Sequence, residues 1–239
     1  MKLVIGNQKT YMNKEEVLSF IESTNQNNNI DKNVIVCPSS LFISLYDKSN
    51  FEIGLQNVSL TGNGASTGEI SATQIKSMNI PYCIVGHSER RQMFNETGEE
   101  TNKKLGMLLN EEITPILCIG ETKEERDATK AEEVITKELK EAFNEISKEE
   151  LQKIIVAYEP IWSIGTGVIP TLEEIKETMI FIKNYIKDNY SIELKVLYGG
   201  SVSAKNIDEL NTIEECNGYL IGGASSKSEE FNYIIKSVK

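Results

Sequence analysis

The chain has 239 residues, a formal net charge of −11 at pH 7 and a pI near 4.8. That length suits one large α/β domain or two small ones, and because no linker interrupts it we expect residues 1–239 to form one domain. The acidic balance argues against binding to nucleic acid or to an anionic membrane. No apolar run approaches the roughly 20 residues that a membrane-spanning helix needs.

The cysteines and the single histidine restrict the chemistry further. The four cysteines lie far apart, three of them in apolar runs: Cys37, Cys83, Cys118 and Cys216. We therefore expect buried free thiols in a reducing compartment, which makes the protein cytoplasmic. With one histidine and no CxxC pair, no metal site is expected.

Short apolar runs alternate with longer helical patterns along the whole chain. The expected strands are Leu3–Ile5, Val34–Cys37, Ile53–Gln56, Tyr82–Val85, Pro115–Ile119, Ile154–Tyr158, Leu194–Tyr198 and Tyr219–Ile221. Most of these runs are unbroken, which is typical of strands that are covered on both faces. Capping boxes predict helix starts at Ser71, Thr122 and Thr171. An apolar stripe at helical spacing predicts a further helix through Ile135, Leu139, Ala142, Phe143 and Ile146.

Eight strand-and-crossover units in a chain of this length predict an α/β fold, a single closed (β/α)8 barrel. The alternative is an open, doubly wound sheet with a nucleotide crevice. No GxGxxG or Walker sequence follows the first expected strand, which disfavours that alternative.

In such a barrel the functional residues follow the carboxyl ends of the strands. The candidates at those positions are Asn7, Lys9, Gln56, Asn57, His87, Glu89 and Glu159. Glu159 ends a buried run and could act as a base, although a surface glutamate in a loop is the alternative. In the segment after it, Pro160 restricts the backbone, whereas Gly165 and Gly167 allow many backbone conformations. This pattern predicts a hinged lid: Pro160, Ile161, Trp162, Ser163, Ile164, Gly165, Thr166, Gly167 and Val168.

Two charged candidates have structural alternatives. Lys9 could supply the positive charge that an anionic substrate needs in an acidic protein, or it could be an ordinary surface lysine. His87 could exchange protons near neutral pH, or it could be a structural histidine. For Glu89 we expect an ion pair with Arg90 or Arg91.

Glycine-rich turns follow the last two expected strands, at Gly199–Ser201 and Gly222–Ser225. Bare backbone amides can bind an anion without a formal charge. Phosphate frequently binds at the turns after strands seven and eight of a barrel. With Gly165 in the sixth loop, these turns predict a phosphate site.

Taken in order, these segments resemble the triosephosphate isomerase family. The resemblance covers the whole chain through Gly6–Lys9, Gly86–Arg91, Cys118–Thr122, Glu159–Trp162, Ile164–Gly167, Tyr198–Ser201 and Gly222–Ser225. It implies a TIM barrel and an enzyme of glycolysis and gluconeogenesis that interconverts dihydroxyacetone phosphate and D-glyceraldehyde 3-phosphate. It implies no metal or organic cofactor.

The resemblance also implies residue roles. Glu159 would be the base and His87 the neutral electrophile, a pair for which this family is itself the standard illustration. Lys9 and Asn7 would stabilise and orient the substrate oxygens, with Glu89 in support. The phosphate would be held by the backbone at Gly165, Ser201, Gly222 and Gly223. Family members usually form homodimers by inserting the loop after strand three, here with Thr67 and Gly68, into a neighbour.

Three positions depart from the family pattern. Gln8 stands where the family generally has Trp, which predicts altered packing beneath the first strand rather than altered chemistry. Pro170 follows Val168 and Ile169 where the family commonly has Lys-x-Ala, and predicts a stiffer lid hinge. Ser226 replaces a usual Leu, which predicts a thinner apolar lining and a lower pKa for Glu159.

Two other functions remain as alternatives. Another phosphate-binding barrel enzyme, an aldolase or a synthase, is one; a Schiff-base aldolase would need a lysine at a strand's carboxyl end, whereas Lys195 begins its strand. A non-catalytic binding protein on the same fold is the other, and the intact set of Lys9, His87 and Glu159 argues against it.

Overall fold

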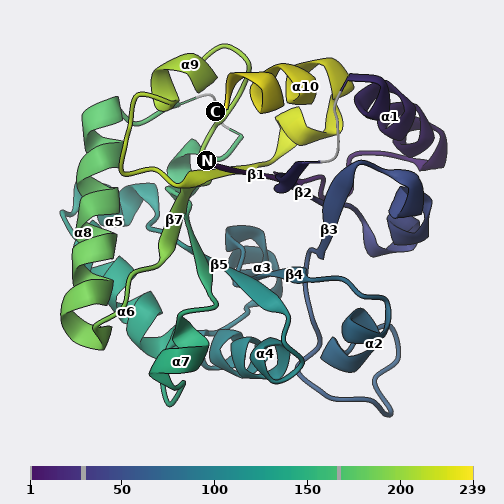
Figure 1. Ribbon diagram of the computed structural model, residues 1–239. Coiled ribbons are helices and arrows are strands. Elements are labelled where there is room, and N and C mark those ends of the chain that lie inside the picture. The colour runs from purple at the N-terminus through teal and green to yellow at the C-terminus, as the bar shows by residue number, and fades with distance from the viewer. Residues whose placement is uncertain (1, 28–30, 166–167, 239) are drawn as a thin grey trace.

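The computed structural model describes residues 2–27, 31–165 and 168–238. Within these residues eight parallel strands form a closed barrel, in which each strand pairs with the next and the last pairs with the first (Figure 1). The strands are β1 (Leu3–Asn7), β2 (Asp31–Cys37), β3 (Phe51–Leu55), β4 (Tyr82–Val85), β5 (Thr114–Ile119), β6 (Ile155–Tyr158), β7 (Lys195–Tyr198) and β8 (Gly218–Ile221). The predicted TIM barrel is confirmed, and the open-sheet alternative is wrong because β1 is hydrogen-bonded to β8.

The predicted strands are all present, with ends shifted by a few residues. β2 begins at Asp31, before the expected Val34, because Asp31 pairs with Phe51 of β3 across an irregular register. β3 ends at Leu55 rather than Gln56. The first and last residues of these strands are therefore set by hydrogen bonding to a neighbouring strand rather than by the length of the apolar run.

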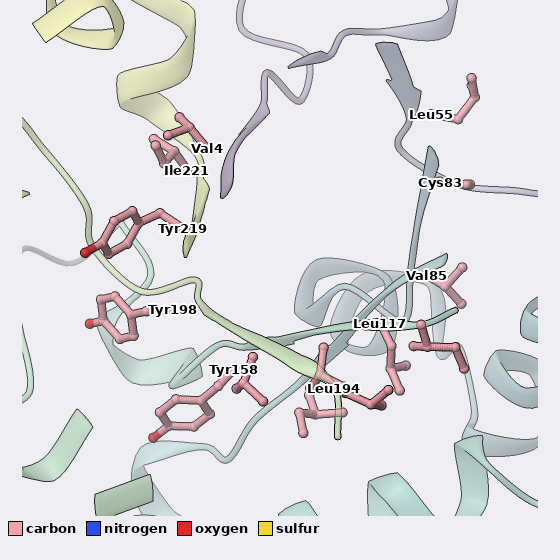
Figure 2. Packing of buried hydrophobic residues seen from close by; sticks show 14 of the residues in the cluster. Val4, Leu55, Cys83, Val85, Leu117, Tyr158, Leu194, Tyr198, Tyr219 and Ile221 are labelled. Atoms are coloured by element: carbon pink, nitrogen blue, oxygen red, sulfur yellow. The ribbon is translucent and has the colours of Figure 1, made fainter. Parts of the chain in front are cut away.

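The strands have two apolar faces because successive side chains of a strand point to opposite sides. One face fills the barrel interior, where Ile5, Ile35 and Leu197 pack together with no more than traces of exposed surface. The other face packs against the surrounding helices. Figure 2 shows side chains of this second layer, among them Val4 and Leu117, pointing away from the barrel centre. This double burial explains the unbroken apolar runs of the sequence.

Helices connect the strands on the outside of the barrel (Figure 1). The α-helices are α1 (Lys14–Asn27), α2 (Ala72–Ser77), α3 (Ser88–Phe94), α4 (Gly98–Asn110), α5 (Lys123–Asp127), α6 (Ala131–Ala142), α7 (Lys148–Leu151), α8 (Leu172–Tyr190), α9 (Ile207–Leu210) and α10 (Ser228–Ser237). The 3-10 segments are η1 (Ser40–Lys48), η2 (Ile161–Ser163) and η3 (Gly223–Ser226). The capping boxes predicted at Ser71, Thr122 and Thr171 are confirmed.

One helix is shorter than predicted. α6 ends at Ala142, so Phe143 and Ile146 lie beyond it, although Phe143 remains buried. Glu145 has a φ of 56°, a left-handed conformation that a right-handed helix excludes. The four cysteines are buried free thiols, as predicted. Among the described residues, no helix has the length and apolarity to cross a membrane.

Candidate active site

A cavity of about 580 Å³ opens at the carboxyl ends of the strands. It collects residues that are distant in sequence because parallel strands all end at the same rim of the barrel. The predicted site residues that line it are Asn7, Lys9, His87, Glu159, Gly165, Ser201, Gly222 and Gly223. Glu89 lines an adjoining cavity of about 570 Å³, which Asn7, Lys9 and His87 also line.

Glu159 and His87 face each other within this cavity. His87 Nε2 lies 3.2 Å from Glu159 Oε1, and both side chains are almost completely buried. Glycines make room for the glutamate. A Cβ at Gly199 would lie 2.7 Å from Glu159 Cγ, and one at Gly120 would lie 1.8 Å from the Glu159 carbonyl oxygen. The strand ends therefore press on Glu159 from both sides and leave it little freedom.

The hydrogen bonds of His87 determine which ring nitrogen carries the proton. His87 caps α3, and its Nδ1 accepts the backbone N–H of Glu89 at 3.2 Å. The hydrogen on Nε2 is then directed toward Glu159. Burial lowers the pKa of His87, but the Glu159 carboxylate raises it more. Because Nδ1 accepts this amide hydrogen, the single proton of a neutral imidazole at this position would lie on Nε2.

The ionisation of Glu159 results from opposing effects. Burial raises its pKa, whereas His87, Lys9 and the backbone N–H of Ser88 together lower it further than burial raises it. The group is therefore a carboxylate at neutral pH. Glu159 is only 2% exposed, and neighbouring donors lower its pKa. The effect predicted for Ser226, relative to family members with Leu at this position, stays a prediction.

Lys9 brings positive charge to the rim. Its Nζ lies 2.5 Å from Glu89 Oε1, and its backbone N–H donates to Asn7 Oδ1 at 3.2 Å. Lys9 has a φ of 47°, and its carbonyl accepts a hydrogen bond from the Gln56 side chain. A Cβ on Gly222 would lie 3.8 Å from Lys9 Nζ. The ammonium group thus lies between Glu89 and the last glycine turn.

The predicted pairing of Glu89 with a neighbouring arginine is wrong. Consecutive residues of a helix project from different sides, so Glu89, Arg90 and Arg91 face different partners. Glu89 pairs with Lys9, Arg90 Nε lies 2.6 Å from Glu96 Oε2, and Arg91 Nε lies 3.6 Å from Glu138 Oε1.

The Gly199–Ser201 turn and the first half of the predicted lid lie together on the wall of the cavity. The Ser201 hydroxyl donates to the Ser163 carbonyl at 2.5 Å. The Trp162 indole N–H donates to Glu121 Oε1 at 3.1 Å. Gly165 has a φ of 68°, which glycine adopts without strain. Thr166 and Gly167 lie outside the described residues, and Val168 beyond them is 54% exposed.

A buried charged cluster behind β4 was missed by sequence reasoning. Glu96 accepts hydrogen bonds from Lys104 at 2.5 Å, from Arg90 at 2.6 Å and from the backbone N–H of Gly86 at 3.2 Å. Burial raises the pKa of Glu96, but Lys104 and Arg90 lower it more. Gly86 immediately precedes His87, so this cluster anchors the histidine. A lysine and a glutamate eight residues apart gave no signal of their pairing.

A second missed group lies behind β5. Glu138 accepts the backbone N–H of Gly120 at 2.8 Å, and Arg91 donates to the Cys118 carbonyl at 3.3 Å. Burial raises the pKa of Glu138 to about 7, although Arg91 acts against this. Because Gly120 presses on the backbone of Glu159, these contacts help to place the glutamate. Among the described residues, no group of three or more His, Cys, Asp or Glu side chains could hold a metal ion.

Comparison with known proteins agrees with this geometry. A family model described as triosephosphate isomerase matches residues 2–238. Proteins named triosephosphate isomerase are similar over nearly the whole chain. The relative from Francisella philomiragia is 37% identical over 98% of this chain and 96% of its own length. Those from Alkaliphilus oremlandii and Dictyoglomus thermophilum are each 39% identical, over 98% and 99% of both chains respectively.

Proposed function

Since the chain belongs to the triosephosphate isomerase family, we propose that Glu159 and His87 carry out its proton transfers. The enzyme interconverts dihydroxyacetone phosphate and D-glyceraldehyde 3-phosphate, and the residue-level roles rest on one observation. A carboxylate and an imidazole face each other at 3.2 Å inside a cavity that is rimmed by glycine turns.

In the proposed reaction, the Glu159 carboxylate removes a proton from the carbon beside the substrate carbonyl. The electron pair of that C–H bond forms the carbon–carbon double bond of an enediolate, and the carbonyl oxygen takes the negative charge. The Nε2–H of His87 donates to this oxygen and passes the proton between the two enediolate oxygens. Glu159 then returns its proton to the neighbouring carbon, so that no proton is gained or lost.

Lys9 and Asn7 support the charge that develops in this step. The Lys9 ammonium lies at the rim beside both Glu89 and the Gly222 turn, where it can attract an anion. Asn7 is 5% exposed and holds the Lys9 backbone through its side-chain oxygen. Glu89 fixes the lysine and is a supporting residue in this scheme.

The phosphate group is proposed to bind the backbone at Gly165, Ser201, Gly222 and Gly223. Support comes from their common position on the wall of the cavity. Backbone amides in such turns bind anions without adding a side-chain charge. The segment from Pro160 to Val168 is proposed to close over the bound substrate, which excludes water from the enediolate.

A coupled assay of glyceraldehyde 3-phosphate isomerisation tests this assignment against Glu159→Gln. The variant keeps the shape of the side chain and loses the base, so kcat should fall by about 10²- to 10⁴-fold. Glu149→Gln is a matched control, because Glu149 is an exposed glutamate on the distant helix α7. Full activity of Glu159→Gln would eliminate the proposed base.

The aldolase and binding-protein alternatives find no support in the site. Lys195 is exposed at the start of β7, on the far rim of the barrel. Three lysines line the cavity. Lys9 is paired with Glu89, and Lys205 and Lys227 are exposed, whereas a Schiff-base lysine is desolvated.

A homodimer is also proposed. The adjoining cavity is lined by Glu89 and by Gly68 of the loop after β3, and the nearby side chains of Met93 and Phe94 are 70% and 62% exposed. Apolar side chains this exposed are typical of an interface. We propose that the loop with Thr67 and Gly68 enters this cavity of a second copy. Sedimentation equilibrium should give twice the chain mass of 26.8 kDa, and a monomer at micromolar concentration would contradict it.

Two broader expectations remain proposals. The chain from residue 1 to 239 is proposed to be one domain, because the strands of a single barrel extend from Leu3 to Ile221. A cytoplasmic location is supported by the four buried free thiols.

A further inference from the structure

Gln8 occupies an unexpected position between two residues of the cavity wall. Asn7 and Lys9 line the cavity, whereas Gln8 is 2% exposed and points into the body of the protein. Both ends of its amide are used. Gln8 Oε1 accepts the hydroxyl hydrogen of Tyr46 at 2.5 Å, and Gln8 Nε2 donates to the Ser225 carbonyl at 3.1 Å. The side chain therefore links η1 to η3 through the end of β1.

Tyr46 is held firmly at its end of this link. It is 1% exposed within η1, and burial raises the pKa of its hydroxyl, which stays protonated as a donor. The sequence predicted only altered packing at position 8. A tryptophan, which the family generally has there, offers one N–H donor and no acceptor, so it could not accept the Tyr46 hydrogen. The polar link is thus tied to the glutamine of this chain.

Ser225 connects the link to the last glycine turn. Its backbone N–H and its hydroxyl both donate to the Gly222 carbonyl, at 2.8 and 2.7 Å. Ser225 also packs tightly on β1, since a Cβ at Gly6 would lie 2.9 Å from Ser225 Cβ. A displacement of Ser225 would therefore move the Gly222 carbonyl with it.

The Gly222 carbonyl and the Gly223 N–H belong to one planar trans peptide, in which the two groups point in opposite directions. Ser225 holds the carbonyl from one side, so the N–H is directed to the other. Gly222 and Gly223 both line the cavity. The orientation of this one peptide decides whether its N–H can reach an anion there.

We propose that Gln8 and Tyr46 are positioning residues for the phosphate end of the substrate. Through Ser225 they hold the Gly222–Gly223 peptide in the orientation that presents its N–H to the phosphate. The inference rests on the proposed phosphate site and adds two residues that do not touch the substrate. It assigns a chain-specific role to a position where packing alone was expected.

The test compares substrates with and without a phosphate. Gln8→Met keeps the length of the side chain and removes both hydrogen bonds, whereas Tyr46→Phe removes one. For Gln8→Met, the Kd for inorganic phosphate and the KM for glyceraldehyde 3-phosphate should rise about five- to tenfold, and for Tyr46→Phe about two- to threefold. Turnover of unphosphorylated D-glyceraldehyde should not change. Tyr219→Phe is the matched control, because it removes another buried tyrosine hydroxyl bond, to Asn211.

Each result supports or contradicts the positioning role of Gln8 and Tyr46. Equal losses with both substrates, or an unchanged phosphate Kd in the two variants, would overturn the positioning role. If Gln8→Met does not fold, Tyr46→Phe alone gives the decision, since it keeps the ring. Failure of the wild-type chain to isomerise would refute the proposed function instead, and the phosphate-binding measurement would still decide the role of Gln8.

Discussion

On the β4–β6 side of the cavity, buried acidic and basic side chains hold the backbone next to His87 and Glu159, whereas neutral hydrogen bonds hold the glycine turns after β7 and β8. Glu96, Lys104 and Glu138 anchor the backbone next to His87 and Glu159. Across the cavity, Gln8 and the Ser201 hydroxyl do the corresponding work without a charge. Charged anchors give strong, directed contacts but depend on pH and on complete pairing.

The difference matches what each side has to bind. In the proposed mechanism the side with Glu159 and His87 holds a base and an imidazole, whose protonation states nearby charges can set. The proposed phosphate side would receive a ligand that brings its own negative charge, and a neutral scaffold leaves the backbone amides available to it. The comparison predicts that variants on the first side change stability and pH dependence, and that variants on the second change substrate affinity.

The largest effect is expected for Lys104→Met. It would leave Glu96 as a buried carboxylate with one partner fewer, so the free energy of unfolding should fall by about 3–5 kcal/mol. Lys103→Met on the same helix is the matched control. Its ion pair with Glu99 is exposed to solvent, and its loss should leave the free energy of unfolding nearly unchanged. If urea-induced unfolding gave the same loss of stability for Lys104→Met and Lys103→Met, the buried charge would be no more important than the exposed one.

The next effect concerns Glu138, whose pKa is raised to about 7 by burial. A raised pKa means that the folded protein binds this proton more tightly than the unfolded chain. Its contribution to stability is therefore present below pH 4.5 and is lost as the pH rises through about 7. Unfolding of the wild type and of Glu138→Gln should be compared at pH 5 and pH 8. The variant should gain up to about 3 kcal/mol relative to the wild type between these values.

A smaller effect is expected on the neutral side for Ser201→Ala. Loss of the hydroxyl bond to Ser163 should raise the KM for glyceraldehyde 3-phosphate about fivefold, with a smaller change in kcat. Because neither partner titrates, the ratio of variant to wild-type KM should be the same at pH 6 and pH 9. A ratio that changes with pH would break the comparison.

The smallest effect concerns the lid hinge. Replacing Val168, Ile169 and Pro170 together by Lys, Thr and Ala should shift lid opening and closing about two- to fivefold, since proline restricts the backbone. The reaction itself should be unaffected. Trp162 is the only tryptophan, and its fluorescence after mixing with 2-phosphoglycolate reports the motion. Identical rates would show that Pro170 does not stiffen the hinge.

Much of the fold could be predicted because its signals are local. Apolar runs such as Ile154–Tyr158 and the capping box at Thr171 are confirmed as strand and helix start. Strand ends and the end of α6 could not be predicted from such signals, because pairing and a left-handed residue at position 145 set them. Asn7, Lys9, His87 and Glu159, which line the cavity, were predicted from their places at strand ends, whereas others such as Tyr11 and Lys205 were not predicted.

By itself the sequence determined the barrel and which residues meet at its rim, because burial pattern and strand order decide both. Only the tertiary structure decided how these residues are held. That Glu89 pairs with Lys9, that Lys104 pairs with Glu96, and that Gln8 joins Tyr46 to Ser225 depends on side-chain directions across separate elements. Those directions follow from packing between elements, for which no spacing along the chain carries a signal.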